Sequence, residues 1–182
     1  MSGLYNFPSE TPCQRFVKDL LGSWDTESGK GKFPTMLPFT YGAEFKAEKV
    51  PVKTKAPFVH TTLQSWPSGK KREMGMHYEN GFLRCVGPDD LEWNLAHNFG
   101  VTEVVKGKVT ERVDKSSVFS TDTIRTATLE SSSIGNAGVV TGTKRVIDVN
   151  SSRGTLLDVF YMSTTDVPDI TEHLRTEYLK KK

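Results

Sequence analysis

The sequence has little of what marks nucleic-acid-binding or membrane-inserted chains. Lys and Arg number 24 against 22 Asp and Glu, and the net charge of +2 is spread along 182 residues. Without a basic arm or stripe, the charge gives no case for nucleic acid as a partner. No apolar run approaches membrane-spanning length, and the first residues lack the basic-then-apolar pattern of a secretion signal. We therefore expect a soluble, cytoplasmic protein that does not use a membrane.

Cysteine is also scarce. The chain has two, Cys13 and Cys85, which lie far apart and have no His or Cys neighbour at ligand spacing. The pattern supports neither a zinc knuckle nor a disulfide framework, and a reducing compartment is the simpler interpretation. A chain of this length can bury a sizeable core without such staples.

Apolar residues at helical spacing predict one short helix, over residues 12–21. Thr11 is a suitable N-cap, Pro12 fits the first turn and Gly22 ends the pattern. The period then changes to two, as in FTYGAEF and LEWNLA. Such alternation is typical of half-buried strands.

Further short runs of this kind continue to the end of the chain. They are PFVHTTLQSW, NGFLRCV, GVTEVV, KVTERV, SSVFST, IRTATL, VVTGTKRVIDV and TLLDVFYM. Turn signals separate them, including Lys106-Gly107 between the third and the fourth run. Because closure removes sheet edges, we predict an all-β fold, an up-and-down antiparallel barrel of about ten strands with a short N-terminal helix. Residues 1–11 are expected to form a flexible N-terminus and residues 12–182 the barrel domain, whose interior is wide enough to enclose a ligand.

The stretch LLGSWDTESGKGKFPTM holds the first specific motif. Trp24 is expected to anchor the core, and the alternating Gly29 and Gly31 would let a backbone or a flat ligand approach one face. With Pro34 and Thr35, the stretch resembles the G-x-W-x-G-x-G-x-[YF]-P-T signature of the nitrobindins, haem-binding barrels shaped like fatty-acid-binding proteins.

The resemblance runs from about residue 20 to residue 182, in the same order as in the family. MHYENGFLR at 76–84 is similar to M-H-x-E-x-G-[FY]-x-R, and AHNFGVTEV at 96–104 is similar to A-[HQ]-x-[ST]-G-x-x-E-V. MSTT at 162–165, then Pro168, then His173-Leu174, resembles the closing M-A-T-x-x-x-P followed by H-L. Each piece alone is a weak signal, but four in register are specific.

The resemblance implies a cofactor and a set of residues around it. His173 matches the single protein ligand of a haem b iron, with one haem per barrel. A neutral imidazole on one face of the iron leaves the sixth position open for a small molecule. Thr35 matches a threonine that approaches the haem, and Met76, His77 and Met162 match residues that line its pocket.

The resemblance also implies an activity. The ferric haem would isomerise peroxynitrite to nitrate, and the ferrous haem would bind nitric oxide, with no catalytic group beyond the iron. The expected partners are these small molecules, and pairing of two barrels into a homodimer is left open.

Two length differences bear on this implied site. Trp24 and Phe33 are nine steps apart where the family pattern has eight, and Pro168 and His173 are five steps apart where four are expected. If Leu174 and every second residue after it face inward, His173 points outward unless a bulge or loop intervenes.

The other histidines have simpler interpretations. His77 is equally well explained as a capping or hydrogen-bonded residue, His97 as a structural one, and His60 has no assigned role.

Two other functions stay open. A barrel that carries a fatty acid or another apolar ligand would need an inward arginine to clamp a carboxylate, and Arg84, Arg125 and Arg145 are available. A haem-free nitrobindin-like interaction module is the third interpretation, because of the extra residue before His173.

Overall fold

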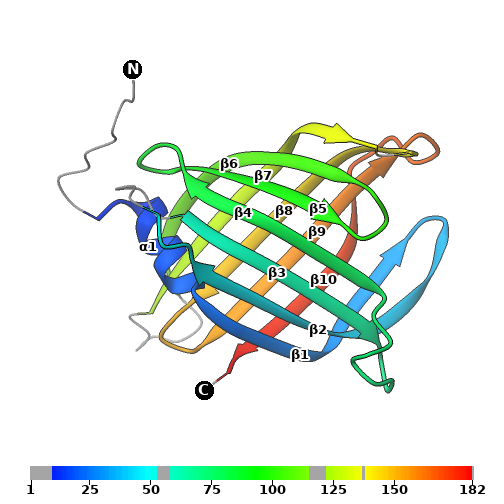
Figure 1. The fold of residues 1–182 in the computed structure, drawn as a ribbon, viewed down its shortest axis with the longest axis horizontal. Coiled ribbons are helices and arrows are strands. Elements are labelled where there is room, and N and C mark those ends of the chain that lie inside the picture. The colour runs from blue at the N-terminus through cyan, green and yellow to red at the C-terminus, as the bar shows by residue number, and fades with distance from the viewer. Residues whose placement is uncertain (1–9, 53–57, 115–121, 137, 182) are drawn as a thin grey trace.

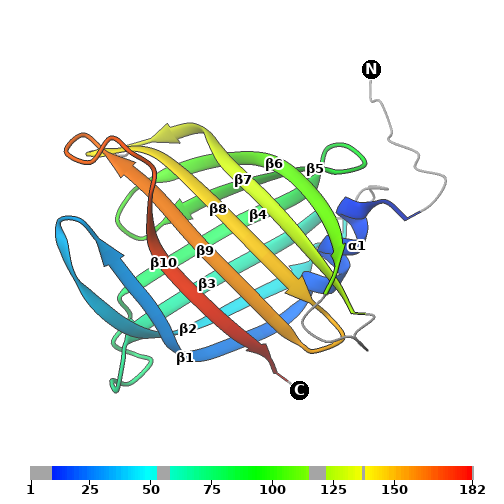
Figure 2. The ribbon, with the colours of Figure 1, turned by 180° about the vertical axis from the view of Figure 1, so that it is seen from behind.

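Ten antiparallel strands close into a barrel in the computed structural model, which describes residues 10–52, 58–114, 122–136 and 138–181. The elements are α1 (Pro12–Leu20), β1 (Gly22–Phe33), β2 (Met36–Lys49), β3 (Phe58–Pro67), β4 (His77–Cys85), β5 (Asp90–His97), β6 (Thr102–Val113), β7 (Thr123–Gly135), β8 (Val140–Asn150), β9 (Thr155–Thr164) and β10 (Thr171–Lys180). Each strand pairs with its neighbours in the chain, and β1 pairs with β10 to close the ring (Figures 1 and 2). The predicted all-β, ten-stranded up-and-down barrel is confirmed.

Two expectations fall outside the described residues. They are most of the flexible N-terminus, at residues 1–9, and the strand SSVFST, at residues 116–121. Within the described ranges, no helix is long and apolar enough to cross a membrane.

Helix α1 packs against one end of the barrel. Thr11 and Gln14 form a capping box at its start, and its buried face consists of Cys13, Phe16, Val17 and Leu20. Figure 1 shows α1 at the end of the barrel opposite the tip of the β1–β2 hairpin. Trp24 is fully buried beside it and donates its indole N–H to the carbonyl of Leu20 at 2.8 Å. This end is therefore filled by side chains, as expected of Trp24.

A disulfide between Cys13 and Cys85 joins α1 to the end of β4. The interpretation that the cysteine pattern does not support a disulfide framework is therefore wrong, and the argument from cysteine for a reducing compartment no longer holds. The two residues are 72 positions apart, and only the packing of α1 over the barrel end brings them together.

We expect reduction of this disulfide to lower the free energy of unfolding by about 2–4 kcal/mol, because the bond closes a long loop in the unfolded chain. Urea unfolding with and without dithiothreitol measures the effect. The double variant Cys13→Ser/Cys85→Ser should show no response to the reductant. An unchanged unfolding midpoint for the reduced wild-type protein would contradict the prediction.

The predicted turn at Lys106-Gly107 is also wrong. Both residues lie inside β6, where Gly107 pairs with Leu129 of β7. A Cβ at Gly107 would collide with the carbonyl oxygen of Thr128. This glycine therefore permits a close backbone approach within the sheet rather than a reversal of the chain.

The glycines of β1 make room for rings of the protein itself. A Cβ at Gly29 would meet the ring of Tyr41, and one at Gly31 would meet the ring of Phe39. The β1–β2 register shifts by one residue between Thr26 and Gly29 and shifts back between Gly31 and Phe33. The stretch from Trp24 to Phe33 therefore contains register irregularities, and the barrel closes despite the greater length of that stretch.

Candidate functional site

A cavity of about 260 Å³ lies inside the barrel. Most of its wall is apolar and comes from strands far apart in the sequence, including Phe39, Leu63, Phe160 and Leu174. Large apolar side chains at its rim are exposed, namely Met36 at 47%, Met76 at 42% and Phe99 at 62%. A cavity with an apolar wall and rim is typical of a small-molecule site.

His173 lies on the wall of this cavity because β10 has a bulge at that position. The pairing of β10 with β9 shifts between Glu172, opposite Tyr161, and Leu174, opposite Phe160. The bulge inserts one residue and breaks the strict alternation of faces. His173 and Leu174 therefore both line the cavity, as do Thr176 and Tyr178 further along β10. The extra residue before His173 does not turn its side chain outward.

The backbone orients the His173 ring. Its Nδ1 lies 3.0 Å from the carbonyl oxygen of Lys32, which can only accept, so Nδ1 carries the hydrogen and Nε2 keeps its lone pair. The rings of Phe33 and Phe160 stand edge-on to it, with centroids 5.5 and 6.4 Å away. Burial lowers the pKa of His173, although the hydrogen bond to Lys32 acts in the opposite direction. A neutral imidazole with a free Nε2 is the form that binds a metal.

The structure brings most of the other sequence-predicted residues to the same cavity. Met76, His77 and Met162 line it together with His173. Thr35 does not, since it is exposed in the turn between β1 and β2. The contacts of these residues with haem stay predictions.

Buried charges form the polar part of the cavity wall. Arg145 binds both carboxylate oxygens of Glu79, at 2.8 and 2.9 Å, and its Nε lies 3.3 Å from Asp158. Burial alone would raise the pKa of Glu79, but the charge and hydrogen bonds of Arg145 lower it. Burial raises the pKa of Asp158 to about 6, with Arg145 acting in the opposite direction. The guanidinium also lies 4.8 Å from the ring centroid of Trp93.

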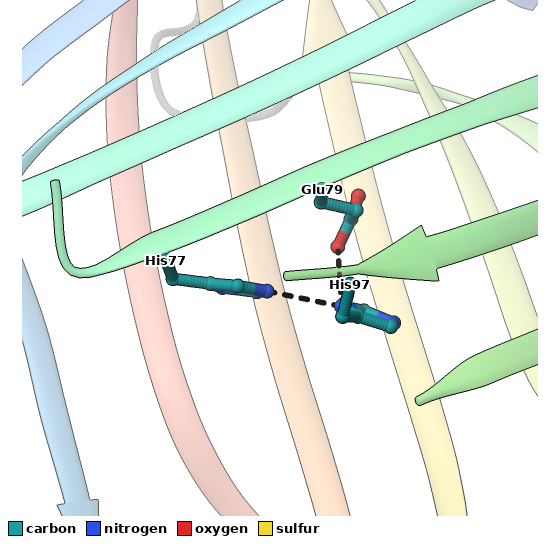
Figure 3. Close-up of side chains that lie close together, drawn as sticks. All are labelled: His77, Glu79 and His97. Atoms are coloured by element: carbon teal, nitrogen blue, oxygen red, sulfur yellow. Dashed lines mark hydrogen bonds and ion pairs between the residues drawn. The ribbon is translucent and has the colours of Figure 1, made fainter. Parts of the chain in front are cut away.

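Two histidines, His77 and His97, extend this network along the cavity wall beside Glu79 (Figure 3). His77 Nε2 lies 3.0 Å from His97 Nδ1, and His97 Nε2 lies 3.2 Å from a carboxylate oxygen of Glu103. Thr143 donates a hydrogen bond to the other oxygen of Glu103. Glu79 lies 3.8 Å from His97 Nδ1. Burial lowers the pKa of His77 to about 4, so its ring is neutral near neutral pH.

The interpretation of His97 as a structural residue missed its place on the cavity wall, and the sequence analysis gave Glu79 and Asp158 no place there. Arg145, one of the three arginines available for an inward position, does line the cavity. Strand alternation could have found part of this set. Glu79 is two residues after His77, and Asp158 is two before Phe160, so each shares a face with a cavity residue. That Glu79 lies opposite His97 in the β4–β5 pair could not be predicted without knowing the register of the sheet.

The fold and the cavity together define a small-ligand-binding β-barrel with a histidine on the cavity wall. Residues 15–180 match a family model described as a THAP4-like, heme-binding beta-barrel domain. A protein of Arabidopsis thaliana named peroxynitrite isomerase Rv2717c is 32% identical over 177 residues, which cover 94% of this chain and 93% of that protein. A protein of Mycobacterium bovis named peroxynitrite isomerase 2 is 35% identical over 96 residues, covering 53% of this chain and 54% of the relative.

A solved structure shows the same architecture. The crystal structure of Rv2717c from M. tuberculosis superposes with a TM-score of 0.77 and 26% sequence identity, covering 96% of this chain and 100% of that one. The chain belongs to the THAP4-like, heme-binding beta-barrel family, and the resemblance to nitrobindins is confirmed.

Proposed function

We propose that this chain binds one haem b in the barrel cavity, with His173 as the axial ligand, and that the ferric protein isomerises peroxynitrite to nitrate. The observation that carries the proposal is the orientation of His173. Its Nδ1 is engaged by the Lys32 carbonyl, so Nε2 is the nitrogen left for a ligand in the cavity. The curated relatives named peroxynitrite isomerase support the choice of reaction.

The residues present fit a large, flat, mostly apolar group. Met162, Phe160 and Leu174 supply apolar wall, and the exposed Met36 and Met76 supply an adaptable rim. The cavity is slightly smaller than the usual range of roughly 300–1,000 Å³ for small-molecule sites. These rim methionines would therefore cover a ligand that extends past the mouth.

Haem, when bound, supplies an iron that acts as a Lewis acid and can bind nitric oxide after reduction. The reaction rearranges the atoms of peroxynitrite, so it requires no proton donor or nucleophile from the chain. What the chain contributes is orientation and an apolar surround. The Lys32 carbonyl fixes the imidazole, and the rings of Phe33 and Phe39 lie edge-on beside it.

The fatty-acid carrier is less well supported. Arg145 is the inward arginine, but Glu79 and Asp158 already surround its guanidinium. Arg84 pairs with Glu92, and Arg125 pairs with Asp19 and Glu111, outside the cavity wall. A fatty-acid carboxylate would therefore have to displace a buried ion pair.

The cytoplasmic location and the small-molecule partners belong to the same proposal. The pairing of Cys13 with Cys85 removes the cysteine argument for that location.

Reconstitution with hemin tests the proposal. We expect one equivalent to be retained after gel filtration, with a sharp Soret band that shifts on reduction and again on addition of nitric oxide. Stopped-flow mixing of the ferric protein with peroxynitrite should then give faster decay and a higher yield of nitrate over nitrite than an equal concentration of free hemin. Retention of hemin without faster decay would reject the reaction but keep the haem site. Failure to retain hemin would reject both.

A further inference from the structure

The side chains of His77, Glu79 and His97 face one another inside the cavity and have no role in the function proposed above beyond lining it (Figure 3). Each offers one nitrogen or oxygen ligand atom, and these three atoms lie within 4.8 Å of one another. Glu79 and His97 sit opposite each other in the β4–β5 pair, and His77 shares a face of β4 with Glu79. The barrel wall therefore holds all three on adjacent strands rather than on a loop.

The spacing of the two nitrogens matches that of two ligands of one metal ion. Metal–nitrogen bonds of about 2.0–2.1 Å separate adjacent nitrogens by roughly 2.9 Å at a right angle and roughly 3.3 Å at a tetrahedral angle. His77 Nε2 and His97 Nδ1 are 3.0 Å apart. An ion can therefore replace the hydrogen between them with little movement of either ring.

Glu103 prepares His97 for this role. Its carboxylate accepts the hydrogen on His97 Nε2, so Nδ1 of the neutral ring keeps its lone pair and points to His77 and Glu79. A carboxylate behind a ligating imidazole is the usual support of a metal-bound histidine, because it fixes both tautomer and orientation. Thr143 in turn holds Glu103.

The charge of the cavity wall also favours a cation. Three buried carboxyl groups, those of Glu79, Glu103 and Asp158, accompany one guanidinium, that of Arg145. Among the described residues that line the cavity, no second Arg or Lys is present. Arg145 occupies one lone pair on each oxygen of Glu79, and each oxygen has another that can bind a metal.

We propose that His77, Glu79 and His97 form a second metal site, for a divalent transition-metal ion of the zinc class, separate from the haem ligand His173. Two imidazoles and one carboxylate suit Zn²⁺, Co²⁺, Ni²⁺, Cu²⁺ or Fe²⁺, whereas Mg²⁺ and Ca²⁺ prefer oxygen ligands alone. With three protein ligands, the remaining positions of the ion face the cavity and are open to water or a small molecule.

Titration of the haem-free protein with Co²⁺ tests the site, since visible absorption bands report its coordination. We expect one equivalent to bind and one equivalent of Zn²⁺ to displace it. Glu103→Gln removes the group that supports His97 and should weaken Co²⁺ binding by roughly 10–100-fold. His77→Ala removes a metal ligand itself, so it should weaken binding by more than about 100-fold. His77 begins β4 next to the exposed Met76, so its truncation leaves the packed end intact.

Two other histidine variants complete the test. His60 lies outside the cavity wall and bonds Asn80 at 2.9 Å, so His60→Ala should bind Co²⁺ like the wild type. His173→Ala should also keep Co²⁺ binding, which separates this site from the haem ligand. Absence of saturable Co²⁺ binding, binding that survives His77→Ala, or loss in His173→Ala alone would overturn the inference. Because no hemin is present, these outcomes do not depend on the proposed haem function.

Discussion

The variant His173→Ala is expected to lose hemin affinity by more than about 100-fold, since an axial ligand contributes more than a supporting group, whose loss costs roughly 10–100-fold. The fold should survive, because the packed core at the α1 end does not include His173. The measurement is a hemin titration followed by gel filtration, with circular dichroism to verify the barrel. The Soret band should be lost or broadened in the variant.

His97→Ala is the comparison for this prediction. His97 lines the same cavity but is not the proposed axial ligand, so the variant should retain hemin with a Soret band that still reports histidine ligation. If His173→Ala binds hemin with the wild-type spectrum, His173 is not the ligand. If both variants fail to bind, the pocket depends on the whole histidine network instead.

The variant Arg145→Met is expected to lower the free energy of unfolding by about 3–5 kcal/mol, because removing one partner of a buried ion pair leaves the other charge uncompensated. Arg145 is 4% exposed and Glu79 is also 4% exposed, so solvent cannot replace the lost guanidinium. Urea unfolding at pH 8 measures the loss. Arg84→Met is the matched control. Arg84 pairs with Glu92 and is half exposed, so this substitution should lower the free energy of unfolding by at most about 1 kcal/mol.

The loss for Arg145→Met should be smaller at pH 5 than at pH 8. The pKa of Asp158 in the folded protein is already raised to about 6, so the cost of its buried charge appears only as the pH rises through that value. Without Arg145 the pKa of Asp158 rises further and that of Glu79 rises from its lowered value, so protonation near pH 5 removes unpaired charge. A loss below about 1 kcal/mol at pH 8 would mean that these carboxyls are not ionised beside Arg145, and a loss that grows towards pH 5 would contradict the predicted pH dependence.

The features that sequence patterns missed depend on contacts between segments that are far apart in the chain, or on a break in strand pairing. The interpretation of Lys106-Gly107 as a turn followed local chemistry, whereas the glycine is needed where β6 crosses close to β7. The pairing of Cys13 with Cys85 depends on α1 folding back over the barrel end. The strand alternation that would direct His173 outward holds only for an unbroken strand, and β10 is bulged at that residue.

The sequence by itself determined the class of fold and most of the residues around the cavity. The change from helical to alternating spacing after Gly22 predicts the helix and the strands, because each period follows from local backbone geometry. The motifs also name Met76, His77, Met162 and His173, which meet on one cavity wall.

Only the tertiary structure decided which way His173 points, that Cys13 bonds Cys85, and that Glu79 faces Arg145 and His97. These features depend on the register of paired strands and on bulges. Register is set when the barrel closes and its core packs, so one added residue in a strand can redirect a side chain without any visible change in local pattern.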